Sequence, residues 1–203
     1  MEDCNSPGQE PSIAYELHGA LYLNITNRCS NDCVFCIRHK KGGVGYNLWL
    51  KREPSVPEIL AAIGDPTRYR EVVFCGYGEP LERPEVVIAV AEALKKQGVE
   101  VRLNTNGLAD LILGYDILPQ LRGLIDVISI SLNSATPEGY VALTRSSFGT
   151  RSFPALLDFI RRSKLHIPKV ILSVVRYPGL DLIEVQKIAK ALDLELRVRE
   201  YME

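Results

Sequence analysis

The residues whose type and spacing best suit metal chemistry in this chain are three cysteines. Cys29, Cys33 and Cys36 lie just after the first predicted strand with the spacing C-x3-C-x2-C. Such a triad can bind three irons of a 4Fe-4S cube, whereas a cluster held only by protein uses four cysteines. The fourth iron would be open to a substrate or cofactor, like the vacant position of a catalytic zinc. A cluster-based catalyst is therefore the first hypothesis.

His39 offers a second use for the same cysteines. Together with Cys29, Cys33 and Cys36 it could complete a Cys3His zinc site in a noncatalytic or redox-sensing module. Structural zinc usually stabilises a small domain that lacks a core, but a chain of 203 residues that is 46% apolar can bury a sizeable core without metal. The composition favours the cluster, and the zinc module remains the alternative of another class.

The composition of the chain indicates its compartment and the classes of partner that it is not expected to bind. The five cysteines are an odd number and no apolar signal segment precedes them, so a disulfide framework is disfavoured and a reducing cytoplasm is expected. Cys75 lies in an apolar strand and is predicted to be a buried free thiol. The net charge is -1 and no apolar run approaches a membrane span. We therefore expect neither a large nucleic-acid footprint nor membrane insertion.

Apolar, β-branched runs alternate with segments of helical period, which is typical of parallel β-α units. The predicted strands are residues 21–26, 71–75, 99–104, 126–132, 169–175 and 195–200. Right-handed crossovers would curl these six strands into an open doubly wound sheet or an incomplete barrel. Residues 1–12 are predicted to be a flexible lead-in, and residues 13–203 to form a single domain.

Polar and glycine-rich residues follow four successive predicted strands. They are the cysteine loop, the run Gly76-Tyr77-Gly78-Glu79-Pro80, the run Thr105-Asn106-Gly107, and the strand end that leads to Asn133. Ligands of parallel α/β proteins bind at the carboxyl ends of the strands. These four strand ends are therefore predicted to converge on one site.

The cysteine motif and the glycine run resemble those of a known family, the radical S-adenosylmethionine (SAM) enzymes. Their cluster motif has an aromatic residue before the last cysteine, which is Phe35 here, and their Gly-Gly-Glu-Pro motif corresponds to residues 77–80. Tyr77 replaces the first glycine, but Gly76 preserves a Gly-x-Gly-Glu-Pro turn. The resemblance covers residues 21–201. Residues 22–38, 45–50 and 74–81 are most similar to the TatD nuclease-associated radical SAM proteins.

The resemblance implies an α/β fold, a partial (βα)6 TIM-like barrel of parallel strands with outer helices. It also implies a 4Fe-4S cluster on Cys29, Cys33 and Cys36, with SAM chelating the fourth iron. Reductive cleavage would give a 5'-deoxyadenosyl radical that abstracts hydrogen from an unknown substrate, as in an oxidoreductase or lyase. An electron donor such as flavodoxin or ferredoxin would be a partner. A glycyl-radical activating enzyme and a compact nucleotide-modifying enzyme remain narrower alternatives.

The same resemblance implies which residues contact SAM. Glu79 and the backbone of the glycine run would accept from the ammonium, and Arg145 would pair with the carboxylate. The full set is Phe35, Gly76, Tyr77, Gly78, Glu79, Asn104, Ser131, Asn133, Arg145 and Val175. Plain structural interpretations stay open: a solvated turn for Glu79, a surface position for Arg145 and core packing for Val175. The glycine-containing segment 42–54 has the length of a lid.

Overall fold

The computed structural model describes residues 10–40 and 43–202. Within them, one seven-stranded sheet has the order β1-β2-β3-β4-β5-β6-β7, so every strand pairs with its neighbours in sequence. The strands are Ala14–Leu17 (β1), Ala20–Leu23 (β2), Val72–Phe74 (β3), Val101–Thr105 (β4), Val127–Ser131 (β5), Lys169–Arg176 (β6) and Glu195–Glu200 (β7). β1 is antiparallel to β2, and all later pairs are parallel.

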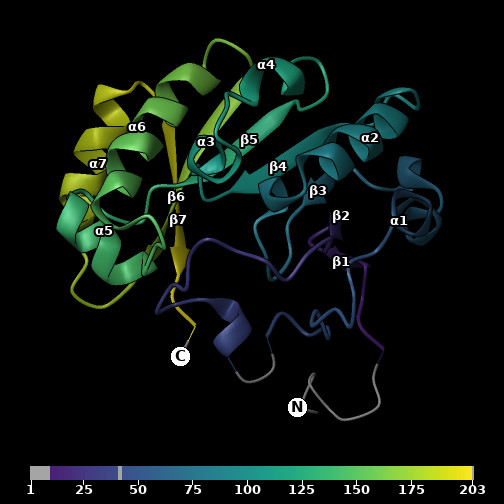
Figure 1. The fold of residues 1–203 in the computed structure, drawn as a ribbon, viewed down its shortest axis with the longest axis horizontal. Coiled ribbons are helices and arrows are strands. Elements are labelled where there is room, and N and C mark those ends of the chain that lie inside the picture. Colours follow the sequence, from purple (N-terminus) through teal and green to yellow (C-terminus); the bar gives the residue numbers. More distant parts are fainter. Residues whose placement is uncertain (1–9, 41–42, 203) are drawn as a thin grey trace.

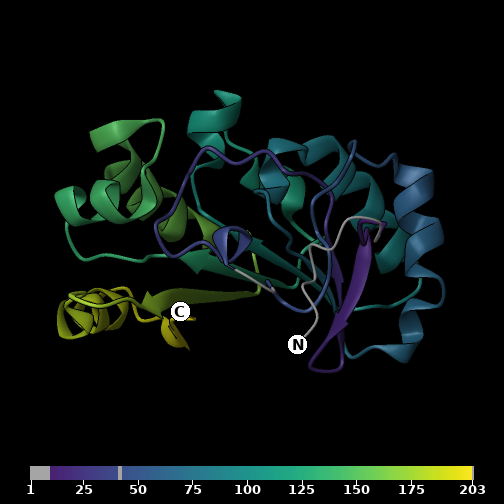
Figure 2. The same ribbon diagram turned by 90° about the horizontal axis from the view of Figure 1, so that it is seen from below.

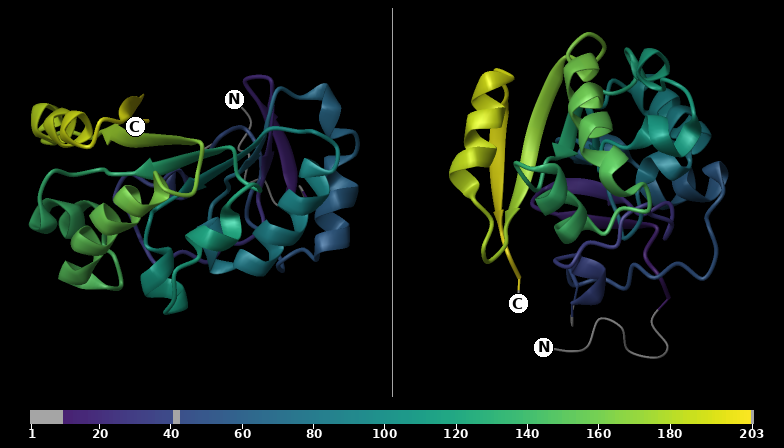
Figure 3. Two further views of the ribbon diagram at one scale, coloured as in Figure 1. Left: turned by 90° about the horizontal axis from the view of Figure 1, so that it is seen from above. Right: turned by 60° about the vertical axis from the view of Figure 1, so that its left-hand side comes forward.

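Helices connect the parallel strands and lie along the outer side of the sheet (Figure 1). They are Val56–Ile63 (α1), Pro84–Lys95 (α2), Ala109–Leu113 (α3), Leu118–Leu121 (α4), Pro137–Thr144 (α5), Ser152–Ser163 (α6) and Leu182–Ala191 (α7). Figures 2 and 3 show the sheet curling, with the helices on its convex side. The predicted partial barrel is confirmed, and β1 and β7 form its edges.

The six predicted parallel strands correspond to β2 to β7, and the structure adds an antiparallel edge strand, β1, that the sequence does not predict. β1 and β2 form a hairpin whose two turn residues, His18 and Gly19, have positive φ values of 50° and 74°. Two positive φ values are typical of a type I′ turn, which is usually marked in sequence by Asn-Gly or Asp-Gly. A strand of only four residues followed by a His-Gly turn gives neither a clear alternation nor a usual turn signal in the sequence.

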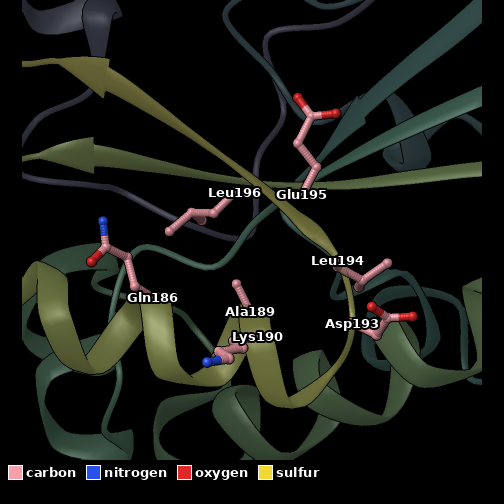
Figure 4. A pocket seen from close by; sticks show the side chains of 7 residues that line it. All are labelled: Gln186, Ala189, Lys190, Asp193, Leu194, Glu195 and Leu196. Carbon is pink, nitrogen blue, oxygen red and sulfur yellow. The ribbon is translucent and has the colours of Figure 1, made fainter.

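Side chains of the strands alternate between the two faces of the sheet. Leu23, Phe74, Leu103, Ile130 and Leu172 are fully buried and pack in the main hydrophobic core under the helices. Because successive side chains in a strand point to opposite faces, their neighbours in sequence point to the concave face. At the edge of the sheet, Figure 4 shows Leu196 on the side of α7 and Glu195 pointing away from it.

The shallow pocket in Figure 4 is separate from the cysteine loop. It has a volume of about 400 Å³ and lies between α7 and β7 on the helical side of the sheet. Its charged members Lys190, Asp193 and Glu195 point in different directions (Figure 4). Such a surface has no convergent polar groups and does not resemble a binding site. None of the helices in the described ranges is long and apolar enough to cross a membrane.

Candidate functional site

The cysteine loop lies across the carboxyl ends of the parallel strands (Figure 1). Cys29, Cys33 and Cys36 are partly buried free thiols. Two backbone hydrogen bonds tie the loop to the end of α5: Asp32 N–H donates to the Thr144 carbonyl at 2.9 Å, and Val34 N–H to the Leu143 carbonyl at 3.0 Å. The residues between the cysteines are thus held by a helix more than 100 positions later in the chain.

The glycine turn after β3 supports the base of this loop. Glu79 N–H donates to the carbonyl of Arg28, directly before the first cysteine, at 2.8 Å. A Cβ on Gly78 would lie 2.4 Å from the Thr26 carbonyl oxygen and 2.5 Å from that of Arg28. Only a residue without a side chain lets the two backbones approach so closely. The Gly-x-Gly turn therefore positions the cysteine loop, whatever it also does for a ligand.

Asn24 completes this support and was not singled out from the sequence. A Cβ on Gly76 would collide with its side-chain oxygen. That oxygen accepts from Tyr77 N–H at 3.3 Å, while the amide nitrogen donates to the carbonyls of Ser12 at 3.1 Å and Leu48 at 2.8 Å. Asn24 is fully buried and joins three segments at the end of β2. A lone asparagine after a strand gives no such signal in sequence.

Glu79 is buried, with a relative exposure of 3%, so the solvated-turn interpretation is wrong. Its carboxylate accepts from Asn106 N–H at 2.6 Å, Leu81 N–H at 3.1 Å and the Thr105 hydroxyl at 2.8 Å. Burial raises its pKa to about 7, and these hydrogen bonds oppose the rise. Glu79 thus fastens the end of β3 to the end of β4. Its contact with the SAM ammonium stays a prediction.

Burial makes the Cys29 and Cys33 thiols harder to ionise. Burial raises the pKa of Cys29 to about 11 and that of Cys33 to about 12, and the Arg38 guanidinium opposes both shifts. Arg38 is held in place by hydrogen bonds to the Asn31 carbonyl at 3.3 Å and to Asp32 at 2.7 Å. Metal binding requires thiolates, so iron would have to supply the compensating charge and displace the protons.

The arrangement fits a cluster better than a single zinc ion. In the described part of the chain, no three His, Cys, Asp or Glu side chains are grouped around a point where one ion would sit. Nε2 of His39 lies 2.9 Å from Asp32 Oδ1. A Cys3His zinc site needs its ligands to converge on one ion, whereas a cubane spreads three thiolates over three irons. Three soft thiolate ligands from one short loop suit the cubane.

Other residues predicted to contact SAM lie at the ends of β4, β5 and β6. Asn133, at a φ of 51°, is buried and accepts from Val175 N–H at 3.3 Å, so it joins the ends of β5 and β6. Ser131 pairs in register with Ser173 of β6. Asn104 has a buried side-chain oxygen without a hydrogen-bond partner among the described residues. These strand ends are brought together, and their contacts with SAM stay predictions.

Arg145 lies beside the cysteine loop and is exposed. It adopts the left-handed conformation, with a φ of 46°, at the end of α5, and Nη1 lies 3.9 Å from Asp32 Oδ2. Its side chain is 62% exposed and is therefore free to reorient. The fold places an exposed guanidinium at the rim of the loop, which agrees equally with a ligand contact and with a surface position.

An aromatic cluster closes the far side of the cysteine loop and was missed in the sequence. The Phe35 ring lies 6.0 Å from Tyr177, which follows β6, and Tyr177 lies 5.0 Å edge-on from Tyr201, which follows β7. Nζ of Lys40 donates to the Tyr201 hydroxyl at 2.5 Å and lies 4.4 Å above its ring. The loop is thereby attached to the last two strands. Aromatic residues just after strand ends were the available signal.

Segment 43–54 packs on the other side of the loop, whereas residue 42 of the predicted lid lies outside the described residues. Leu48 is buried with Tyr15 and Tyr77 in a second small hydrophobic cluster. The Trp49 ring lies 5.1 Å from Tyr77 in an edge-on arrangement and is partly exposed. This cluster covers the concave face over β1 to β3 and leaves the face over β4 to β7 to other residues.

Comparisons with known proteins agree with this geometry. The profile described as Radical SAM superfamily matches residues 23–192. The GTP 3',8-cyclase of Limosilactobacillus fermentum is 31% identical over 193 residues, which cover 92% of this chain and 55% of the cyclase. The chain thus spans about half the length of the known relatives it matches. The narrower TatD-associated subgroup stays a prediction.

Two solved structures share the fold. The structure of TYW1 with a lysine-pyruvate adduct bound has a TM-score of 0.65 and 14% identity, and the match covers 93% of this chain and 66% of that one. Streptococcus suis SuiB bound to the precursor peptide SuiA has a TM-score of 0.64 and 14% identity, over 96% of this chain and 40% of SuiB. At this identity the likeness establishes the shared architecture.

Proposed function

Because the chain belongs to the radical SAM superfamily, we propose that Cys29, Cys33 and Cys36 hold a 4Fe-4S cluster with which the protein cleaves SAM reductively. The observation that carries the proposal is the position of the triad: one loop over the carboxyl ends of parallel strands, supported by the glycine turn. When bound, cluster and SAM supply one-electron cleavage and hydrogen abstraction from a substrate.

The chain's own residues orient and shield this chemistry. The turn from Gly76 to Gly78 offers backbone carbonyls close to the cysteine loop, which suit an ammonium group because it has only donors. Ser131, Asn133 and Val175 provide polar and apolar contacts at the ends of β5 and β6. Asn104, with its unpaired buried oxygen, offers a further acceptor on the same face. Arg145 supplies a guanidinium whose geometry matches a carboxylate.

Water must be kept from a reactive intermediate, and two aromatic groups serve this purpose. Phe35, Tyr177 and Tyr201 cover the loop towards β7, and Tyr77 with Trp49 covers it towards β1. Apolar rings exclude solvent without offering a competing ligand.

The substrate, the electron donor and the compartment belong to the same proposal. A flavodoxin or ferredoxin would deliver the electron, and the odd number of cysteines suits a reducing cytoplasm. Of the narrower activities, the likeness to a GTP 3',8-cyclase supports action on a nucleotide over activation of a glycyl-radical protein. That likeness spans only part of the cyclase.

Anaerobic purification and a SAM cleavage assay test the proposal. We expect a brown protein with about four iron atoms per chain that yields 5'-deoxyadenosine and methionine from SAM and dithionite. Cys33→Ala should lose both properties. Cys75→Ala is the matched control, because that thiol lies outside the triad, and it should keep the iron. A colourless protein with one zinc per chain would contradict the cluster.

A further inference from the structure

The concave face over β4 to β7 is polar and basic. Ser129 of β5 pairs in register with Ile171 of β6, Ser173 of β6 with Arg197 of β7, and Val175 with Arg199. Leu196 and Val198, which alternate with the two arginines, pack on the main core under the helices. Arg197 and Arg199 therefore point to the concave face, together with the serines.

The floor of this face is made of short side chains with unused hydrogen-bonding capacity. Ser129 is 6% exposed and Ser173 is 4% exposed, and neither hydroxyl bonds to another described residue. The buried Asn104 oxygen next to Ser129 in register is also unpaired among the described residues. Buried polar groups in folded proteins are nearly always hydrogen-bonded, so these groups call for a polar molecule above them.

Positive charge on the same face is only partly neutralised. Arg102 of β4 pairs with Glu71 at 3.1 Å, whereas the carboxylate of Glu195 lies 3.9 Å from Arg197. The side chain of Arg199 makes no hydrogen bond or ion pair with any other described residue. Burial raises the pKa of the Cys75 thiol, and both Arg199 and Arg102 oppose that rise. The two guanidiniums therefore act on the same point of the concave face from different strands.

A cavity extends this basic face towards the amino ends of the strands. It has a volume of about 270 Å³, and Arg102 and Arg197 are the residues it shares with the face described above. Its basic residues are Arg70, Arg102, Lys169 and Arg197, against the two carboxylates of Glu71 and Glu100. The lining thus has an excess of positive charge, and a cavity lined mainly by one sign of charge attracts ligands of the opposite sign.

We propose that the concave face over β4 to β7 binds an oxyanion, carboxylate or phosphate, that the substrate carries, with Arg197 and Arg199 as its principal ligands. A guanidinium binds either group through two parallel hydrogen bonds, and the hydroxyls of Ser129 and Ser173 add donors from the floor. This inference rests on the proposed function, since it names the substrate class of the same site.

Anion binding can be measured without knowing the substrate. Inorganic pyrophosphate and malonate are titrated by calorimetry into the reconstituted protein, and also into the cluster-free protein. We expect saturable binding of one anion per chain, and the tighter of the two probes identifies the group. Arg199→Gln should weaken binding by roughly tenfold or more, because a hydrogen bond to a charged group is lost. Arg197→Gln should act in the same direction.

Arg176→Gln is the matched control. Arg176 lies on β6, pairs with Glu200 at 3.1 Å, and points to the opposite face of the sheet from Val175. The Arg176→Gln variant should change anion affinity less than twofold. SAM affinity, measured by equilibrium dialysis, should be unchanged in Arg199→Gln.

Three outcomes would overturn the inference: no saturable anion binding, an equal loss in Arg176→Gln, or loss of SAM binding together with anion binding, which would make Arg199 a ligand of the cofactor. Failure of the proposed function gives a different result. A protein that binds pyrophosphate or malonate but never holds iron would keep the anion site and refute the cluster.

Discussion

The two faces of the curled sheet differ in almost every property although they are built from the same strands. On the convex face, Phe74, Leu103 and Leu172 are fully buried against the helices. On the concave face lie Arg102, directly before Leu103 in β4, and Ser173, directly after Leu172 in β6. Side chains alternate between the two faces along each strand, so every second residue stabilises the fold and the residues between them are available for chemistry. The difference predicts that mutations on the two faces have separable effects.

The largest effect is expected from the convex face. Leu103→Ala leaves a cavity in the main core and should lower the free energy of unfolding by roughly 2–5 kcal/mol. Ser129→Ala, on the concave face of the neighbouring strand, removes an unpaired hydroxyl and should change it by less than about 1 kcal/mol. Urea denaturation of both variants measures the difference. Equal losses would show that the concave face is also a structural core.

Glu79 is an ionisable group that the fold buries at the carboxyl ends of β3 and β4. Its folded-state pKa of about 7, raised from 4.5 by burial, means that the folded protein binds the additional proton between these pH values. The free energy of unfolding should therefore fall as pH rises from 4.5 to 7, by about 3 kcal/mol from this group.

Glu79→Gln has no proton to titrate and should lack this fall. Urea denaturation of cluster-free protein between pH 4.5 and 8 gives the two profiles, and their difference isolates Glu79 from the other titrating groups. Parallel profiles would mean that Glu79 has an ordinary pKa in the folded state.

Gly78 tests the connection between the sheet and the cysteine loop. In Gly78→Ala, the new Cβ would lie 2.4 Å from the Thr26 carbonyl oxygen, so one backbone must move. We expect a loss of roughly 1–3 kcal/mol in stability and a lower iron content per chain. Gly114→Ala is the control: its φ of 77° makes alanine strained, but no atom lies within 4 Å. It should lose stability and keep its iron, and a similar iron loss would refute the positioning role.

The smallest effect is expected at the aromatic cluster. Tyr201→Phe removes the hydrogen bond from Lys40 and keeps the ring beneath the ammonium. The stability change should be at most about 1 kcal/mol, because the contact is near the surface. The aromatic cluster attaches the cysteine loop to β6 and β7, so the rate at which iron is released to a chelator should rise in this variant. An unchanged rate would limit Tyr201 to packing.

The sequence was informative where a local pattern carries the structure. Apolar, β-branched runs that alternate with segments of helical period predicted β2 to β7, and the cysteine spacing identified the loop. β1 was missed because its His-Gly turn lacks the usual marker. Asn24, Tyr177 and Tyr201 were missed for a different reason: each acts through partners far along the chain, and a single sequence carries no record of such contacts. The burial of Glu79 likewise depends on β4, which the turn itself does not reveal.

An anaerobic crystal structure with SAM tests the central claim most directly, because the claim is that the concave face and its cysteine loop form one cofactor site. We predict a cubane bound to Cys29, Cys33 and Cys36, with SAM over the carboxyl ends of β3 to β6 and open space above Arg197 and Arg199. A single tetrahedral ion bound by the three cysteines and His39, or SAM bound on the helical side of the sheet, would contradict it.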